Sequence, residues 1–296
     1  AGERGDGVHL VTGGLSGFGF EAARWLVRCG ARRVALLGRR GADTPGAAAR
    51  VAELTAAGAA VSVYAGDVAD RASLAAVLAR VRRHGPLCGV VHAASAISDG
   101  LAIDIDAEAA AALLRPKLTG AVLLDAVTRD DPLDLFVMFS SATTLLGVTG
   151  QGIYVAANLA LEALARQRRA DGRPALAVGW GPIADAGYLA DRPDTREALA
   201  RRLGARPMPA AQALAALPAL AAAGLPVAAF AETSLTEARR YLPILATSLC
   251  AEIRAEAESA PSDDTLIEKL ASLDADGVVE LLKTVVTEEA GGILRL

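Results

Sequence analysis

The sequence predicts an α/β protein, a three-layer sandwich built on a doubly wound parallel sheet. Short apolar runs alternate with Ala/Leu-rich stretches through about the first 230 residues. Several of these runs are continuously apolar, which is typical of parallel strands that helices cover on both faces. A strand-helix-strand order of this kind implies right-handed crossovers and a Rossmann-like arrangement.

The elements follow from this alternation in chain order. Strands are expected at 9–11, 33–37, 60–64, 89–92, 133–139, 175–178 and 226–230, and helices at 21–29, 69–83, 107–129 and 156–168. We assign residues 1–235 to one catalytic domain and 236–264 to a segment that ends in a polar linker. Residues 265–296 read as a short helical tail, interrupted near 274–277.

Composition excludes several classes of function. A net charge of -4 and an aromatic content of 4% argue against binding of nucleic acid. No apolar run is long enough to span a bilayer, so we expect a soluble, cytoplasmic protein without a membrane partner. Cys29, Cys88 and Cys250 lie far apart without ligand spacing, so we expect free thiols and no metal site.

A glycine-rich turn follows the first strand and opens a helix. Such a turn lets the backbone approach a pyrophosphate, and the helix amino terminus adds amide donors and partial positive charge. We expect a dinucleotide to bind there. The residues concerned are Thr12, Gly13, Gly14, Leu15, Gly17, Phe18 and Gly19.

The end of the second strand favours NADPH over NADH. That strand ends in Arg39 and Arg40, where an acidic residue would accept the ribose hydroxyls of NAD. Guanidinium groups suit a 2′-phosphate, although two arginines can also simply end a strand in an Arg-rich protein. Further cofactor contacts are expected after the third and fourth strands, from Asp67, Val68, His92, Ala93 and Ala94.

A serine and a tyrosine point to reduction of a ketone. Ser141 ends a strand, and Tyr154 follows thirteen residues later at the start of a helix. This spacing resembles that of the short-chain dehydrogenase/reductase family. A developing alkoxide needs a proton donor, and a phenol serves near neutral pH if a nearby positive charge lowers its pKa.

The position of the lysine narrows the resemblance. Most of that family has a lysine four residues after the tyrosine, where this chain has Asn158; the only lysine in the first 268 residues is Lys117. Ketoreductases of modular polyketide synthases place the lysine on the earlier helix and the asparagine after the tyrosine. The resemblance implies that Tyr154 donates the proton and Ser141 orients the ketone. It also implies that Lys117 binds the nicotinamide ribose and lowers the tyrosine pKa, while Asn158 holds the group together.

The same resemblance implies a substrate and partners. Such domains reduce β-ketoacyl chains on the phosphopantetheine arm of an acyl carrier protein, beside a structural half and other synthase domains. Residues 184–201 would form a lid over the substrate, and the tail resembles the start of a carrier protein. Substrate contacts and stereocontrol are expected from Asp99, Leu146, Gln151 and Pro182.

Stereochemistry is predicted from two positions. Asp99 matches the second aspartate of the Leu-Asp-Asp marker of B-type enzymes, which give the D-alcohol, and Leu146 stands where the opposite type has tryptophan. Thr149 and Ile153 depart from the proline and asparagine that B-type enzymes often carry. The sequence therefore favours a B-type outcome.

Two other functions remain open. One is a free-standing dehydrogenase that acts on a small diffusible ketone, against which the exchanged Lys117 and Asn158 argue. The other is a scaffold domain that binds NADPH without reducing a substrate, against which the intact Ser141 and Tyr154 argue.

Overall fold

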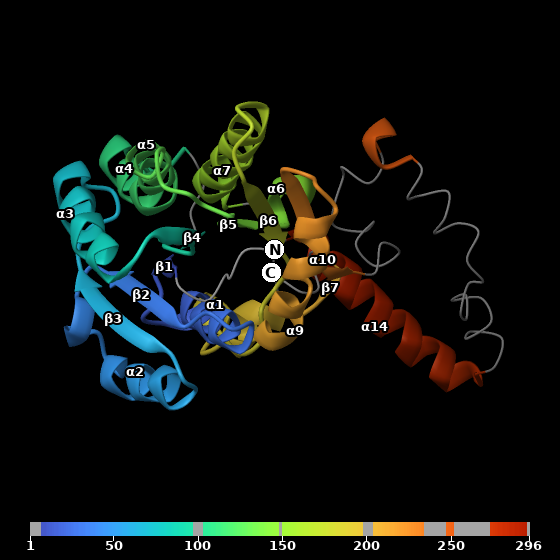
Figure 1. Cartoon of the computed structure of the whole chain (residues 1–296). Coiled ribbons are helices and arrows are strands. Elements are labelled where there is room, and N and C mark those ends of the chain that lie inside the picture. The colour runs from blue at the N-terminus through green and yellow to red at the C-terminus, as the bar shows by residue number, and fades with distance from the viewer. Residues whose placement is uncertain are drawn as a thin grey trace. The chain divides into compact units, whose positions relative to one another are not determined.

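A computed structural model of the chain describes residues 7–96, 103–147, 150–197, 204–233, 247–251 and 273–294 (Figure 1). The chain divides into two compact units. The first comprises Ala1–Arg201 and Ala205–Thr233, and the second comprises Arg202–Gly204 and Ser234–Leu296.

A seven-stranded parallel sheet forms the centre of the first unit, with the strand order β3-β2-β1-β4-β5-β6-β8. Its strands are β1 (Val8–Thr12), β2 (Arg33–Gly38), β3 (Ala60–Ala65), β4 (Leu87–His92), β5 (Leu135–Ser141), β6 (Leu176–Trp180) and β8 (Val227–Phe230). Short strands β7 (Ala205–Arg206) and β9 (Glu232–Thr233) pair antiparallel beside it. The predicted doubly wound Rossmann-like fold is confirmed.

The order of the strands fixes where a ligand can bind. From β1 the chain winds outward to β2 and β3, and then returns to β4 on the other side of β1. Thr12, the last residue of β1, pairs with Leu37 and with His92, so the carboxyl ends of three strands meet at one edge. Ligands of doubly wound sheets bind in the crevice at such a switch point.

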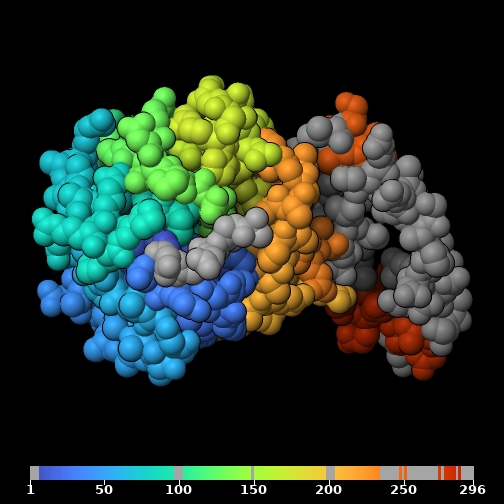
Figure 2. All heavy atoms as spheres, viewed as in Figure 1, coloured from blue at the N-terminus to red at the C-terminus, as the bar shows by residue number. Residues whose placement is uncertain are grey.

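Helices cover both faces of the sheet, with α1, α2 and α9 below it and α3, α4, α5 and α7 above it in the view of Figure 1. The helices are α1 (Gly17–Arg28), α2 (Ala47–Ala56), α3 (Arg71–Val81), α4 (Ala107–Leu114), α5 (Gly120–Val127), α6 (Thr143–Leu146), α7 (Gly152–Ala170), α9 (Ala210–Ala215) and α10 (Leu217–Ala222). Each face has its own apolar core. In the space-filling view the segments of α1 and of α9 form one continuous surface (Figure 2).

The expected single helix at 107–129 is divided. A π-helical turn, η3 (Arg115–Thr119), separates α4 from α5 and carries Lys117 at its centre. Pro116 lacks an N–H group and cannot make the regular helical bond, which favours an irregular turn. Turns of this kind occur frequently at functional sites.

A buried ion pair joins α5, which follows the turn of Lys117, to the end of α7. Asp125 of α5 accepts from Nη1 of Arg168 and of Arg173, at 2.5 and 2.7 Å. Arg168 lies near the end of α7 and is 1% exposed, with its guanidinium carbon 3.7 Å from the ring centroid of Phe136. Removing one partner of such a pair leaves an uncompensated buried charge, so Asp125 stabilises the packing of α5 against α7.

In the second unit, the described residues form the turn η6 (Ser248–Cys250) and the helix α14 (Ala275–Leu294). The interruption predicted near 274–277 is the start of this helix, because Asp274 Oδ1 accepts from Gly277 N at 2.8 Å in an amino-terminal cap. The expected helical residues 265–272 lie outside the described part. No described helix is long and apolar enough to cross a membrane.

Candidate active site

The glycine-rich turn lies where β1 ends and α1 begins. Gly13 has a φ of 70°, and a Cβ on it would approach Ala93 O to 3.0 Å. A Cβ on Gly19 would lie 2.3 Å from Gly13 O. Larger residues at these positions would therefore push the turn away from the sheet edge. Because these positions carry no Cβ, a pyrophosphate could approach the main chain of the turn closely.

The side chains of the turn pack inward. Leu15 is buried, and its Cδ1 would lie 3.1 Å from a Cβ on Gly38. The ring of Phe18 lies with its centroid 4.8 Å from that of Phe139 and 5.5 Å from that of Trp180. These contacts fasten the turn to the ends of β2, β5 and β6. Leu15 therefore has only main-chain groups to offer a cofactor, whereas the ring of Phe18 is half-buried.

Two exposed arginines follow β2 at the same edge. Arg39 and Arg40 come directly after Gly38, which contacts Leu15 of the turn. Within the described part of the chain, neither side chain makes an ion pair. An unengaged guanidinium beside a dinucleotide turn fits a 2′-phosphate.

Asp67, expected to contact the cofactor, is already engaged within the protein. Its Oδ1 accepts from Ala69 N at 2.8 Å, and its Oδ2 lies 3.2 Å from Arg115 Nη2. Val68 is buried, and its side chain lies against Gly120. The sequence analysis missed Arg115, whose nearness to Lys117 was the only signal. The ion pair ties the end of β3 to the turn that carries this lysine.

His92, at the end of β4, uses both ring nitrogens inside the protein. Its Nδ1 lies 2.7 Å from Thr12 Oγ1, and its Nε2 lies 3.0 Å from Lys117 O. Burial lowers the pKa of His92 to about 4, so the ring is neutral at physiological pH. Ala93 N donates to Thr12 O at 3.1 Å, which holds the chain after β4 against the glycine-rich turn.

Lys117 and Asn158 meet in the interior although 41 residues separate them. Lys117 is 4% exposed and Asn158 is fully buried. Lys117 Nζ donates to Asn158 Oδ1 and to Phe139 O, both at 2.6 Å. Asn158 Nδ2 in turn donates to Tyr154 O at 2.9 Å. The fold thus brings together the lysine, asparagine and tyrosine that the sequence singled out.

Tyr154 lies partly buried beside this pair. Lys117 Nζ lies 5.2 Å from the centroid of its ring. Burial raises the pKa of Tyr154, while hydrogen bonding from Asn158 and from Ser141 lowers it. Burial also lowers the pKa of Lys117 to about 7. In this structure the Lys117 ammonium points to Phe139 O and to Asn158 Oδ1, so the expected lowering of the tyrosine pKa by Lys117 stays a prediction.

Ser141 is the last residue of β5 and faces the same site. Its Oγ accepts from Thr143 Oγ1 at 3.0 Å and from Thr143 N at 3.3 Å. The preceding Ser140 donates its Oγ to Glu162 Oε1 at 2.8 Å. Glu162 is buried and lies two helical turns after Tyr154 on the same face of α7. The sequence analysis missed this residue, although the spacing of eight was visible.

The substrate residues are placed only in part. Leu146 ends α6, and the carbonyl of Gln151 accepts from Val155 N at 2.8 Å in the first turn of α7. Pro182 is buried after β6, where its carbonyl accepts from Met208 N at 3.0 Å. Asp99 lies outside the described residues, as do Thr149 and the end of the expected lid.

The described part of the expected lid, 184–197, has hydrogen bonds within it. It contains the turn η4 (Gly187–Leu189), and Arg196 Nη1 donates to Ala184 O at 3.0 Å. A Cβ on Gly17 would lie 2.9 Å from the Cα of Gly187. The segment after β6 therefore lies directly against the glycine-rich turn.

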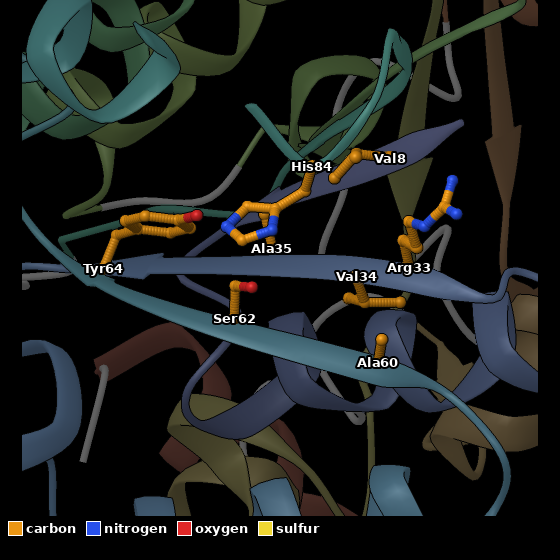
Figure 3. A pocket seen from close by; sticks show the side chains of 8 residues that line it. All are labelled: Val8, Arg33, Val34, Ala35, Ala60, Ser62, Tyr64 and His84. Carbon is orange, nitrogen blue, oxygen red and sulfur yellow. The ribbon is translucent and has the colours of Figure 1, made fainter. Parts of the chain in front are cut away.

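A small pocket lies at the opposite edge of the sheet (Figure 3). Its volume is about 90 Å³, and its lining includes the first residues of three strands, Val8, Arg33 and Ala60. A dinucleotide is too large for this space. The candidate site is therefore the carboxyl edge, where the turn and the buried lysine lie.

The fold and this site define a short-chain dehydrogenase/reductase. The sequence matches the KR domain family over residues 7–185. It is 47% identical over 207 residues to the pikromycin polyketide synthase component PikAII of Streptomyces venezuelae, covering 69% of this chain and 6% of that protein. It is 37% identical over 292 residues to the erythronolide synthase EryA2 of Saccharopolyspora erythraea, covering 97% of this chain and 8% of that protein.

Solved structures agree with this assignment. An A1-type ketoreductase superposes with a TM-score of 0.80 at 38% identity, over 88% of this chain and 55% of that one. An A-type ketoreductase from a modular polyketide synthase gives a TM-score of 0.76 at 37% identity, over 92% of this chain and 55% of that one. The chain thus spans about half of these ketoreductases and a small part of the synthases. It belongs to the KR domain family of modular polyketide synthases, and is a ketoreductase domain of the oxidoreductase class.

Proposed function

We propose that this domain uses NADPH to reduce a β-ketoacyl thioester on an acyl carrier protein to the β-hydroxyacyl product. The observation that carries the proposal is the buried bond between Lys117 Nζ and Asn158 Oδ1 beside Tyr154 and Ser141. Burial of an amine at 4% exposure lowers the stability of the fold, so we expect this lysine to be retained for a function. A proton-transfer site supplies that function.

The residues at the carboxyl edge fit a nicotinamide dinucleotide. The glycine-rich turn and the amino terminus of α1 would hold the pyrophosphate, Arg39 and Arg40 the 2′-phosphate, and Lys117 the nicotinamide ribose. Bound there, the dihydronicotinamide supplies the hydride. Arg39 and Arg40 support NADPH in particular, because no acidic residue at the end of β2 would repel the phosphate.

Tyr154 delivers the proton. Burial raises its pKa, so the phenol is protonated at neutral pH, which a group that gives up a proton requires. Ser141 donates a hydrogen bond to the ketone oxygen and holds it toward the phenol. As charge develops on that oxygen, these donors stabilise it. The tyrosinate left behind is stabilised by Lys117 and by Asn158.

The substrate arrives on a carrier protein. The similarity to multidomain synthases supports a phosphopantetheine-bound chain, the structural half of the ketoreductase and further synthase domains as partners. Residues 1–235 act as the catalytic domain, and 236–264 as a segment that ends in a linker. Residues 265–296, which include α14, act as the start of a carrier protein.

The alcohol is D-configured, as in B-type enzymes. Leu146 at the end of α6 supports this outcome, because the opposite type has tryptophan at that position. Asp99 supports it from the sequence alone. The A-type descriptions of two similar structures apply to those proteins, so chiral analysis of the product tests this assignment directly.

One experiment separates this function from its rivals. Oxidation of NADPH is followed with three substrates: a β-ketoacyl group on a carrier protein, the same group on free N-acetylcysteamine, and a small cyclic ketone. The alcohol formed from each substrate is resolved on a chiral column. We expect the highest kcat/KM with the carrier-bound chain and a D-alcohol. Preference for the free cyclic ketone would favour the free-standing dehydrogenase. NADPH binding without turnover of any substrate would favour the scaffold.

A further inference from the structure

His92 takes part in no chemical step of the proposed function, yet it lies in the interior beside residues that do take part. The side chain is 1% exposed at the end of β4. It connects two parts of the site that are 105 residues apart in sequence, Thr12 in the cofactor turn and Lys117 in η3. A polar group buried this deeply with two partners is fixed in place.

The two contacts define one protonation state. A main-chain carbonyl only accepts, so His92 Nε2 carries the hydrogen and donates to Lys117 O. The ring is neutral, because burial lowers its pKa to about 4. Its Nδ1 is then bare and accepts from the hydroxyl of Thr12. The imidazole is therefore an oriented bridge with a donor on one side and an acceptor on the other.

The turn that carries Lys117 depends on outside contacts for its position. In η3 the carbonyl of Lys117 accepts from Gly120 N as well as from His92. A Cβ on Gly120 would lie 3.1 Å from His92 Cε1 and 2.9 Å from Val68 Cγ1, so the chain runs tightly against the imidazole. The bond to His92 fixes the point from which the flexible lysine side chain starts.

We propose that His92 is a positioning residue that sets the place of the Lys117 ammonium through the bond from Nε2 to the lysine carbonyl. The side chain of Lys117 is then anchored at both ends, by β4 at its backbone and by Phe139 O and Asn158 at Nζ. Displacement of a catalytic group by about 1 Å can lower a rate by about 10²-fold. This inference rests on the role of Lys117 in the proposed function.

Two amide substitutions separate the two bonds of His92. In His92→Asn the side-chain nitrogen lies near the place of Nδ1 and falls short of Lys117 O. In His92→Gln the longer side chain places its N–H near Nε2 and can restore that bond. We expect His92→Asn to lower kcat by about 10-fold or more with little change in the KM for the thioester, and His92→Gln to recover most of the loss.

A second readout is independent of turnover. The chain has three lysines, Lys117, Lys269 and Lys283, so labelling with [ζ-15N]lysine gives three side-chain signals. Lys117→Met assigns the buried one. We expect the Lys117 signal to move or lose protection from solvent exchange in His92→Asn and to return toward its wild-type position in His92→Gln. The signals of Lys269 and Lys283 serve as internal references.

The outcomes are distinguishable. An unchanged Lys117 signal and unchanged kcat in His92→Asn would overturn the inference. So would equal defects in both amide variants with equal losses of melting temperature, because they would show a structural role alone. Loss of folding in both variants would also overturn it, since a positioning contact leaves the fold in place. A Lys117 signal that responds as expected in a protein that reduces no thioester would instead refute the proposed function.

Discussion

Burial of the Lys117 amine makes the stability of the domain depend on pH, and the substitution Lys117→Met should remove this dependence. The amine is 4% exposed, and burial lowers its pKa from 10.5 to about 7. In the unfolded chain the same amine is solvated and titrates near its ordinary value. Lys117→Met keeps a long unbranched side chain and removes the titrating group.

The sign follows from proton binding. Between pH 7 and 10.5 the unfolded chain holds a proton on this lysine that the folded chain has released, so stability rises with pH in this window. The gain in stability is complete above pH 10.5, declines as the pH falls through the window, and is lost below about pH 7. At about 1.36 kcal/mol for each pH unit, the whole window amounts to about 5 kcal/mol, and the part from pH 7 to 9.5 to about 3 kcal/mol.

Urea unfolding of wild type and Lys117→Met at a series of pH values measures this term. We expect the free energy of unfolding of the wild type to rise by about 3 kcal/mol relative to the variant between pH 7 and 9.5. Lys283→Met, which removes a side chain that is 68% exposed, is the matched control and should show no such trend. A difference between wild type and Lys117→Met that stays constant with pH would refute the reasoning.

Three further predictions test other parts of the account. Arg39→Ala combined with Arg40→Ala should weaken NADPH binding by about 10-fold or more, because charge-assisted bonds to the 2′-phosphate are lost. NADPH fluorescence measures this affinity. An equal loss of affinity for NADH would contradict the assignment of these arginines to the phosphate. Asp125→Asn should lower the free energy of unfolding in urea by about 3–5 kcal/mol, because it leaves a buried guanidinium unpaired. Glu232→Gln, in an exposed pair, should change it by less than about 1 kcal/mol. Similar changes in the two variants would argue against a stabilising buried pair. Gly19→Ala should abolish NADPH binding while circular dichroism still shows a folded sheet, because its Cβ would lie 2.3 Å from a carbonyl oxygen; wild-type affinity would show that the turn can move.

The sequence predicts the sheet well because parallel strands leave a local signal. Each strand is a short apolar run between helical stretches, so its place can be seen without knowledge of its neighbours. Strand ends are less visible. For example, the first strand was expected at 9–11, but pairing with β2 and β4 extends β1 to Val8 and to Thr12.

The catalytic residues were visible in the sequence for two different reasons. Tyr154 and Ser141 follow a spacing set by one strand and the next helix, and Lys117 stands out because lysine is rare in this chain. Their surroundings were not visible. The bridge of His92 to Lys117 and the bond of Ser140 to Glu162 join segments whose meeting is decided by helix packing. The raised pKa of Tyr154 likewise depends on burial.

The phenol of Tyr154 is the group on which the reduction depends. The most direct test is turnover of a carrier-bound β-ketoacyl thioester by wild type and Tyr154→Phe, followed by loss of NADPH absorbance, with NADPH affinity measured on both proteins. We expect Tyr154→Phe to bind NADPH as wild type does and to turn over at least about 10²-fold more slowly, the contribution of a general acid. Equal turnover by the two proteins would contradict the account.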